Sequence, residues 1–244
     1  MPCPRVPSRP VRSTVRSTER PSRRGRVSAA AALVALAVLA GCRIVPGTTY
    51  TGEGTYYAGD GSGNCSYDAG AAGVLYAAMN EADYENALIC GGYVRATGPD
   101  GTVTVKIVDR CPECAPGDID FSPEAFDVIA DPVDGRVPIS WELVSGGSIG
   151  NVQYRVKEGS SQWWLAIQPR NHRNLVTKLE VQTADGSWVA LERQQYNYFV
   201  AASGLGVGPF TVRLTDNHGE QLVHTGITLN PATVQVTGTQ FATH

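Results

Sequence analysis

The sequence predicts a mainly β protein in which two β units follow one another. Three observations indicate this fold class. Polar and apolar residues alternate between Thr102 and Val108, as in a strand with one buried face. The C-terminal part divides into about seven short strand-like runs separated by turn residues, which is typical of an antiparallel sandwich. The clearest helical spacing of apolar residues is confined to one segment after Ser122.

The first 41 residues have the features of an export signal, and we exclude them from the fold. Residues 1–26 carry eight Arg and one Glu without an apolar period. Residues 29–40 consist only of Ala, Leu and Val. At about 1.5 Å per residue this run is too short for a bilayer core of about 30 Å. A basic segment before a short apolar run is typical of a secretory signal, so we expect an exported protein.

The end of the apolar run, Leu39-Ala40-Gly41-Cys42, resembles the lipobox of bacterial lipoproteins. The resemblance implies that Cys42 is lipidated and becomes the new N-terminus, with residues 42–53 as a spacer. The alternative is an ordinary cleaved signal followed by an unrelated Cys. The protein is therefore expected to be extracellular or anchored by lipid at the outer face of the cell membrane, and the anchor would be its only membrane contact.

The charge of the chain changes sign along its length. Residues 27–150 hold 16 acidic and 5 basic residues, whereas residues 151–244 hold 6 acidic and 7 basic residues. An acidic exported chain has little attraction for phosphate backbones, so we expect no nucleic acid among its partners. The apolar content of 42% is that of a folded protein and argues against general disorder.

Apart from Cys42, four cysteines fall in the acidic part of the exported chain. An even number in an exported protein indicates disulfides, and four cysteines allow three pairings. We favour Cys65 with Cys90 and Cys111 with Cys114. The Cys-Pro-Glu-Cys unit is also compatible with a redox pair or half of a zinc site. Because the sequence has no second CxxC and its His residues lie elsewhere, we expect structural disulfides, no metal and no cofactor.

In the first unit, the expected elements follow in order from a turn-rich loop at residues 58–63. A short apolar run covers residues 75–79, and Asp83 could cap a brief helix that ends at Leu88. Residues 93–97 and 102–108 read as strands joined by a Gly-Pro-Asp-Gly hairpin turn. Ser122 and Pro123 start a helix that ends before Pro132, and residues 137–143 form a last strand.

A Gly/Ser-rich linker at residues 145–150 precedes the second unit, which contains no Cys and little helical pattern. Trp141 in the first unit and Trp188 in the second are both expected in the core. The expected strands of the second unit cover residues 152–158, 164–168, 175–183, 187–192, 209–215, 221–225 and 232–237.

Several runs of the chain resemble bacterial expansins across about residues 53–240. In the first unit these are residues 54–57, 108–112 and 118–123, and in the second unit residues 154–164, 168–172 and 196–200. The resemblance implies a six-stranded double-psi β-barrel at residues 54–147. It also implies an immunoglobulin-like β-sandwich at residues 148–244, classed as a family 63 carbohydrate-binding module.

The resemblance places Thr55, Tyr57, Asp109 and Asp120 in a groove across the barrel. Asp120 matches the general acid of related glycosidases, in which a basic carboxylate follows the aromatic pair. Here Ala58 stands at that position, and Asp60 is the nearest substitute. Inverting hydrolysis needs both carboxylates. Asp109 would orient the surroundings of Asp120, and the alternative is that both acids only cap turns.

The resemblance also implies a linear aromatic platform made of Trp163, Trp164 and Tyr196, with Lys157 near it. Flat rings suit the C–H faces of sugars. Adjacent strand residues point to opposite faces, so the two Trp side chains can share a surface only at a bulge or loop. Residues 159–161 (Gly-Ser-Ser) make such a loop plausible. Otherwise one Trp is in the core and Lys157 is solvated.

These features together predict a monomeric, non-hydrolytic protein that binds and loosens cellulose or a plant cell wall. Cellulose or a related β-glucan is the expected partner, with xyloglucan and peptidoglycan as further candidates. The alternative is an envelope lytic transglycosylase or glycoside hydrolase acting on peptidoglycan or glucan, and a plain adhesin is a third hypothesis. Cys111 stands where bacterial expansins often carry an aromatic residue, which puts the strength of groove binding in question.

Overall fold

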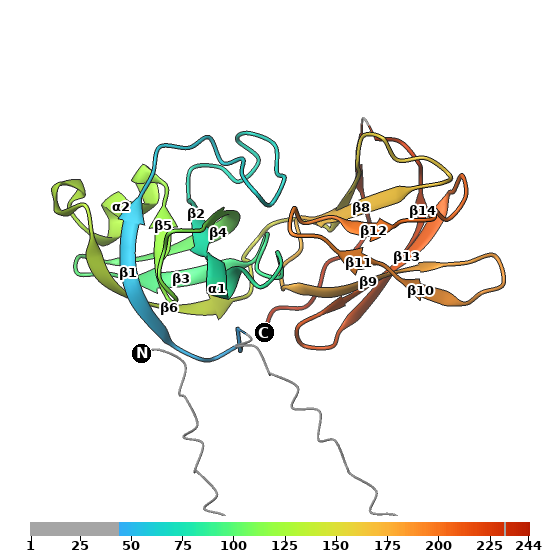
Figure 1. Ribbon diagram of the computed structural model, residues 1–244. Helices are drawn as coiled ribbons and strands as arrows, with labels where there is room; N and C mark the ends of the chain where they lie inside the picture. Colours follow the sequence, from blue (N-terminus) through green and yellow to red (C-terminus); the bar gives the residue numbers. More distant parts are fainter. Residues whose placement is uncertain (1–43, 232) are drawn as a thin grey trace, which may run out of the picture. The chain divides into compact units, whose positions relative to one another are not determined.

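The structure is a computed structural model that describes residues 44–231 and 233–244, and it is mainly β (Figure 1). The expected export signal, Cys42 and its lipidation lie outside the described residues. Across these residues, no helix has both the length and the apolar character needed to cross a membrane.

Six strands of the first unit close into a barrel in the order β1-β5-β2-β4-β3-β6. The six-stranded barrel expected from the sequence is therefore confirmed. Two pairings in it are parallel, β1 with β5 and β2 with β4. The strands are β1 Tyr50–Tyr56, β2 Tyr76–Asn80, β3 Tyr93–Thr97, β4 Thr102–Cys111, β5 Ile119–Phe121 and β6 Val137–Val144.

The barrel begins earlier than the sequence indicated, because residues 50–53 belong to β1 and not to a spacer. Residues 50–54 pair with residues 137–141 of β6. Tyr50 stacks on Trp141, which is fully buried, with 4.4 Å between ring centroids. The outward residues Thr51 and Glu53 are exposed, and the small residue Gly52 between them gives no apolar signal. The alternation of polar and apolar residues at positions 50–53 is therefore too weak to predict a strand from the sequence.

The short helices lie beside the barrel. α2 (Pro123–Ile129) packs against β1, β4 and β5 and starts as predicted, with the Ser122 side chain accepting a hydrogen bond from the Ala125 N–H at 3.3 Å. The prediction for α1 (Glu81–Tyr84) was wrong in its cap. Asn80 is the N-cap, and its side-chain oxygen accepts from the Asp83 N–H at 3.0 Å. A 3₁₀ turn, η1, covers Pro132–Asp134.

The second unit contains two sheets, ordered β10-β9-β13-β14 and β11-β12-β8-β7-β15. Its strands are β7 Gln153–Val156, β8 Leu165–Arg170, β9 Val176–Gln182, β10 Trp188–Ala190, β11 Glu192–Arg193, β12 Phe199–Ala201, β13 Phe210–Asp216, β14 Gln221–Ile227 and β15 Val234–Val236. β11 overlaps the predicted strand 187–192 by one residue, and β12 was not predicted at all, since both strands are very short. Trp188 is only half-buried and packs under the Arg213 guanidinium at 4.3 Å, which corrects its expected core position.

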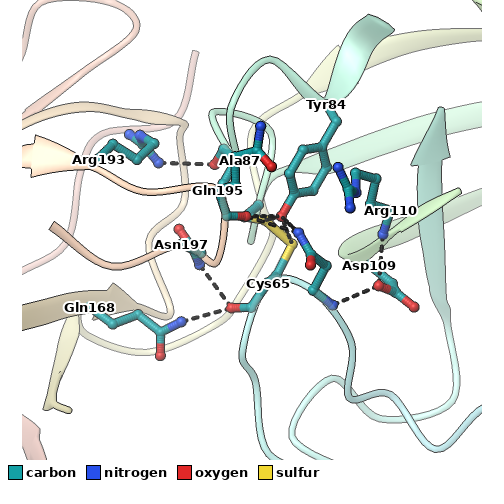
Figure 2. The surroundings of a disulfide bond; sticks show 11 residues. Cys65, Tyr84, Ala87, Asp109, Arg110, Gln168, Arg193, Gln195 and Asn197 are labelled. Carbon is teal, nitrogen blue, oxygen red and sulfur yellow. Dashed lines mark hydrogen bonds between the residues drawn. A yellow bond between two sulfur atoms is a disulfide. The ribbon is translucent and has the colours of Figure 1, made fainter. Parts of the chain in front are cut away.

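Two disulfides join Cys65 to Cys90 and Cys111 to Cys114, which is the pairing favoured from the sequence. Figure 2 shows the first of them beside residues of both units. The Cys65 carbonyl accepts hydrogen bonds from the side-chain amides of Gln168 at 2.8 Å and Asn197 at 3.2 Å. This disulfide therefore fixes a loop of the barrel unit that the second unit contacts directly.

Removing the Cys65–Cys90 disulfide should lower stability more than removing the other one. Its cysteines are 25 residues apart, whereas Cys111 and Cys114 are 3 apart. Loop entropy then predicts losses of about 3.5 kcal/mol and about 2 kcal/mol in the free energy of unfolding. Urea unfolding of the two double Cys→Ser variants measures both losses, and an equal or reversed order would contradict the prediction.

Candidate functional site

One side of the barrel carries an open recess beside β1 and β5. Backbone and side chains of both strands reach it, together with the loop that contains the Cys111–Cys114 disulfide. Its lining residues are Glu53, Thr55, Tyr56, Cys111, Glu113, Cys114, Ala115, Asp118, Asp120 and Arg136.

The recess contains a carboxyl group held by a neighbouring hydroxyl. β1 and β5 run in parallel with Thr55 and Asp120 as register partners, so both side chains point to one face. The Thr55 hydroxyl donates to Asp120 Oδ1 at 2.6 Å. Burial raises the pKa of the Asp120 carboxyl, and the charge of Glu113 raises it further, while the Thr55 hydrogen bond opposes both effects. This carboxyl therefore keeps its proton to a higher pH than an exposed Asp.

Two residues expected in the groove are not among those that line the recess. Asp109 Oδ1 accepts hydrogen bonds from the N–H groups of Asn64 at 2.6 Å and Arg110 at 2.8 Å. A Cβ on Gly63 would lie only 2.3 Å from the Asp109 carboxyl carbon, so the loop rests against this side chain. Asp109 thus anchors this loop, as in the turn-capping alternative, and its charge also raises the pKa of Asp120, as expected for a residue that acts on the surroundings of that carboxyl. The Tyr57 hydroxyl is buried without a hydrogen-bond partner in the described chain, and its burial raises the pKa of Tyr57.

Tyr56 is a recess residue that the sequence analysis missed. Its side chain is 41% exposed, packs against Phe126 with 4.9 Å between ring centroids, and donates through its hydroxyl to the Pro132 carbonyl at 3.3 Å. The sequence showed an aromatic pair at this point but did not show which ring stays accessible. An exposed ring therefore borders the recess even though Cys111 replaces the expected aromatic residue.

The other carboxylates near the recess have different surroundings. Glu53 pairs with Arg136 at 2.5 Å, and both side chains are more than half exposed. Glu113 is exposed and lines the recess together with Asp120. Asp60 lies apart from the recess lining, and its carboxylate accepts from the Ser62 N–H at 2.9 Å and the Ser62 hydroxyl at 2.5 Å. These bonds lower the pKa of Asp60, so it stays ionised within its own loop.

The residues expected to form an aromatic platform lie just before β8 and β12, two neighbouring strands of the five-stranded sheet. Leu165 and Ile167 of β8 point into the core, so Ala166 between them points to the opposite face of the sheet, where it is also buried. Ala166 pairs with Val200 of β12, and its carbonyl accepts from the Lys157 N–H at 3.0 Å. Lys157 therefore stands next to the start of β8, where the two Trp residues precede the strand.

A tight turn explains how Trp163 escapes strand alternation. The Ser161 N–H donates to the Trp164 carbonyl at 2.7 Å, and the Trp164 N–H returns a bond to Ser161 at 3.3 Å. Trp163 lies inside this turn and is 73% exposed, whereas Trp164 is half-buried. A Cβ on Gly204 would lie 2.1 Å from the Gln162 carbonyl oxygen, so only glycine allows the close approach that supports the turn.

Tyr196 and Lys157 both contact Tyr198, a residue not singled out from the sequence. Tyr196 is 36% exposed, and its ring lies 6.0 Å from that of Tyr198. The Lys157 ammonium lies 5.7 Å from the Tyr198 ring centroid, within the range of a cation–π contact. The buried Tyr198 ring thus supports both side chains from below the surface.

Comparisons with known proteins extend over both units. A family model described as "Lytic transglycolase" matches residues 49–141. Expansin-YoaJ of Bacillus subtilis is 42% identical over 176 residues, which cover 70% of this chain and 73% of that protein. Expansin-like protein 2 of Dictyostelium discoideum is 27% identical over 186 residues, covering 71% of this chain but only 45% of that protein.

Two solved structures show the same likeness in three dimensions. The apo expansin of Clavibacter michiganensis is 37% identical with a TM-score of 0.76, and the match covers 81% of this chain and all of that one. A point mutant of the Clavibacter protein in complex with cellohexaose is 36% identical, with the same TM-score and the same coverage.

Proposed function

The chain belongs to the expansin family, and from this premise we propose that it binds cellulose or a related β-glucan and loosens cell-wall polysaccharide without hydrolysing it. The recess carries the proposal, because it combines the Thr55–Asp120 hydrogen bond with the exposed ring of Tyr56. That a Clavibacter expansin has been solved with cellohexaose supports a β-glucan as the ligand.

In this proposal the two units have different roles. Residues 50–147 form the barrel domain that grips a glucan chain in the recess. Residues 148–244 form a family 63 carbohydrate-binding module whose rings pack against the C–H faces of sugars. Trp163 and Tyr196 supply exposed rings, and Lys157 can donate to sugar hydroxyls. The module holds the protein on the polysaccharide. The energy of binding a glucan chain in the recess then offsets the hydrogen bonds that are lost between polysaccharide chains.

Hydrolysis is not part of the proposal because no carboxylate stands at the position of the catalytic base. An inverting mechanism needs a base roughly 6.5–9.5 Å from the acid to activate water. The position after the aromatic pair is Ala58, and Asp60 is engaged by Ser62. In its protonated form, Asp120 therefore serves as a hydrogen-bond donor that strains the glucan chain and leaves it intact.

A lytic transglycosylase or glycoside hydrolase acting on peptidoglycan or glucan is the second candidate. Two observations favour it: the description of the family model over residues 49–141, and the exposed Glu113 carboxylate beside Asp120 in the recess. An enzyme of this kind would release soluble sugar or muropeptide fragments, and Glu113→Gln would stop that release.

A polysaccharide panel tests both candidates with the purified exported chain. Insoluble cellulose, xyloglucan-coated cellulose and peptidoglycan are each incubated with the protein, and bound protein and released fragments are measured. We expect binding to cellulose, extension of cellulose-rich wall strips under constant load, and no soluble fragments. Fragment release that Glu113→Gln removes would replace the proposal with the enzymatic candidate.

We further propose that the protein is exported, monomeric and attached to the outer face of the membrane through Cys42. The lipobox-like run before Cys42 supports the anchor. Detergent partition and mass analysis of the protein from its native membrane should show lipid on Cys42. Cys42→Ser should move the protein to the aqueous phase, and a wild-type chain found only in water without lipid would contradict the anchor.

Wall loosening should weaken as the pH rises through the raised pKa of Asp120. The neutral carboxyl can donate a hydrogen bond to a sugar oxygen, and the ionised form cannot. Burial shifts this loss of the donor to a higher pH than for an exposed Asp. Creep rates measured from acid to neutral pH with the wild type should fall, while cellulose binding by the exposed platform stays constant. A rate that rises over this range would contradict the donor role.

A further inference from the structure

A cluster of metal-ligating side chains lies away from both glycan-contacting surfaces, where the β13–β14 turn meets residues 242–244. Asp216 ends β13, Glu220 precedes β14, and His244 returns to them from the end of the described chain. One ligand atom from each of the three lies within 4.8 Å of the others. His244 Nε2 is 3.9 Å from Glu220 Oε2.

These distances suit a small divalent ion after minor side-chain rotation. Zinc bonds to nitrogen and oxygen of about 2.0–2.2 Å place neighbouring tetrahedral ligands roughly 3.4 Å apart. The Glu220 and His244 side chains are 32% and 39% exposed, so both can move by the small amount required. The cluster also combines two carboxylates with one imidazole, a donor set that zinc and related transition metals accept.

Hydrogen bonds already hold the two carboxylates in place. Asp216 Oδ1 accepts from the N–H groups of His218 at 2.9 Å and Glu220 at 2.8 Å, and Oδ2 accepts from the Asn174 amide at 2.8 Å. An ionised carboxylate has about four acceptor positions, so one remains on Asp216. Glu220 Oε2 accepts from the Ala242 N–H at 2.9 Å. Such supporting bonds are the surroundings that orient metal ligands in proteins.

The charge of the cluster is not balanced by the chain itself. Among residues 44–231 and 233–244, neither Asp216 nor Glu220 forms an ion pair with Lys or Arg, and His244 is the sole cationic partner of Glu220. With a neutral imidazole the three groups carry two negative charges, which one divalent ion neutralises.

A second observation concerns Asn217, the residue that follows Asp216 in the chain. Asn217 Oδ1 is buried without a hydrogen-bond partner in the described chain, and Asn217 lines a recess together with His218 and His244. The His218 ring stacks on the His244 ring with 3.9 Å between centroids, which fixes the plane of the imidazole ligand. A water molecule bound to the ion could donate to the unpaired Asn217 oxygen.

We propose that Asp216, Glu220 and His244 bind one divalent transition-metal ion. The ion would fasten residues 242–244 to the β13–β14 turn and so stabilise this end of the second unit. Asp216 and Glu220 supply charge, and His244 selects transition metals over calcium and magnesium, which prefer oxygen ligands.

Calorimetric titration of Zn²⁺ into the exported chain, prepared without a polyhistidine tag, tests the proposal. We expect one bound ion and an affinity at least about tenfold lower in Glu220→Gln and in His244→Ala. Glu192→Gln, a matched change of an exposed carboxylate on β11, should bind zinc like the wild type. Asp216→Asn is avoided because Asp216 also holds its turn.

Two further measurements distinguish a specific transition-metal site from unspecific binding of divalent ions. Thermal unfolding should shift upward with Zn²⁺ in the wild type and not in His244→Ala, which also shows whether that variant is folded without metal. A Ca²⁺ titration should give much weaker binding than Zn²⁺. Absence of zinc binding, wild-type affinity in either ligand variant, or equal binding of Ca²⁺ and Zn²⁺ would overturn the proposal.

Discussion

Replacing Asp120 by Ala should reduce wall creep about tenfold or more while cellulose binding remains. The substitution removes the carboxyl from the recess and leaves the Thr55 hydroxyl without the acceptor that lies 2.6 Å away. Leaving a glucan oxygen without its hydrogen-bond partner costs about 1–3 kcal/mol, and 1.4 kcal/mol corresponds to tenfold. The orphaned Thr55 hydroxyl lowers the stability of the fold instead. Creep of cellulose-rich wall strips and pull-down on crystalline cellulose measure the two effects.

Asp120→Asn distinguishes the loss of the proton from the loss of the side chain. The amide keeps the shape of the carboxyl but cannot ionise, and it donates a longer and weaker bond than a hydroxyl. We expect most of the creep to be lost and the remainder to be independent of pH. Asp100→Ala, an exposed carboxylate in the β3–β4 turn, serves as the control that keeps full creep. Wild-type creep in Asp120→Ala would exclude this residue from the mechanism.

The same Asn variant should be more stable than the wild type at neutral pH. The folded-state pKa of Asp120 lies above its ordinary value of 3.8, mainly because of burial. The neutral carboxyl therefore stabilises the fold below pH about 3.8, and this contribution disappears as the pH rises through the folded-state pKa. Urea unfolding at acid and neutral pH should show an advantage of the Asn variant that grows with pH. No such growth would mean that burial does not disfavour the carboxylate.

The fold class followed from the sequence because strand periodicity and turn residues are local signals. The alternation from Thr102 to Val108 became β4, and the Ser122 cap became the start of α2. Boundaries failed where the local signal was weak. Tyr50 joins the barrel through its stacking on Trp141, a contact between residues far apart in the sequence. The closure of the barrel was expected only from the family resemblance, and its strand order is a finding of the structure.

The site was less predictable because it depends on which face each side chain takes. The pair Thr55 and Asp120 could be expected together from the resemblance, and the parallel register of β1 and β5 confirms their contact. Local sequence could not decide between Tyr56 and Tyr57, because burial of the second ring depends on distant residues such as Tyr76. The support of Lys157 and Tyr196 by Tyr198 likewise arises only in the folded sheet.

Trp163→Ala should lower the affinity for crystalline cellulose about tenfold or more without lowering stability. The indole is 73% exposed, so the fold loses little packing when it is removed. A large aromatic at the centre of a contact surface is typically worth about 2 kcal/mol or more when truncated. Binding isotherms on crystalline cellulose measure the affinity, and thermal unfolding checks the fold.

Variants of two other Trp residues serve as comparisons for Trp163→Ala. Trp164 is half-buried at the start of β8, so Trp164→Ala should lower both affinity and stability. Trp188→Ala removes an indole of equal size from the other sheet, where it packs under Arg213, and should leave affinity unchanged. If Trp188→Ala weakened binding as much as Trp163→Ala, the loss would reflect general damage to the module. A loss confined to Trp163, Trp164 and Tyr196 would place the glucan on the outer face of the five-stranded sheet.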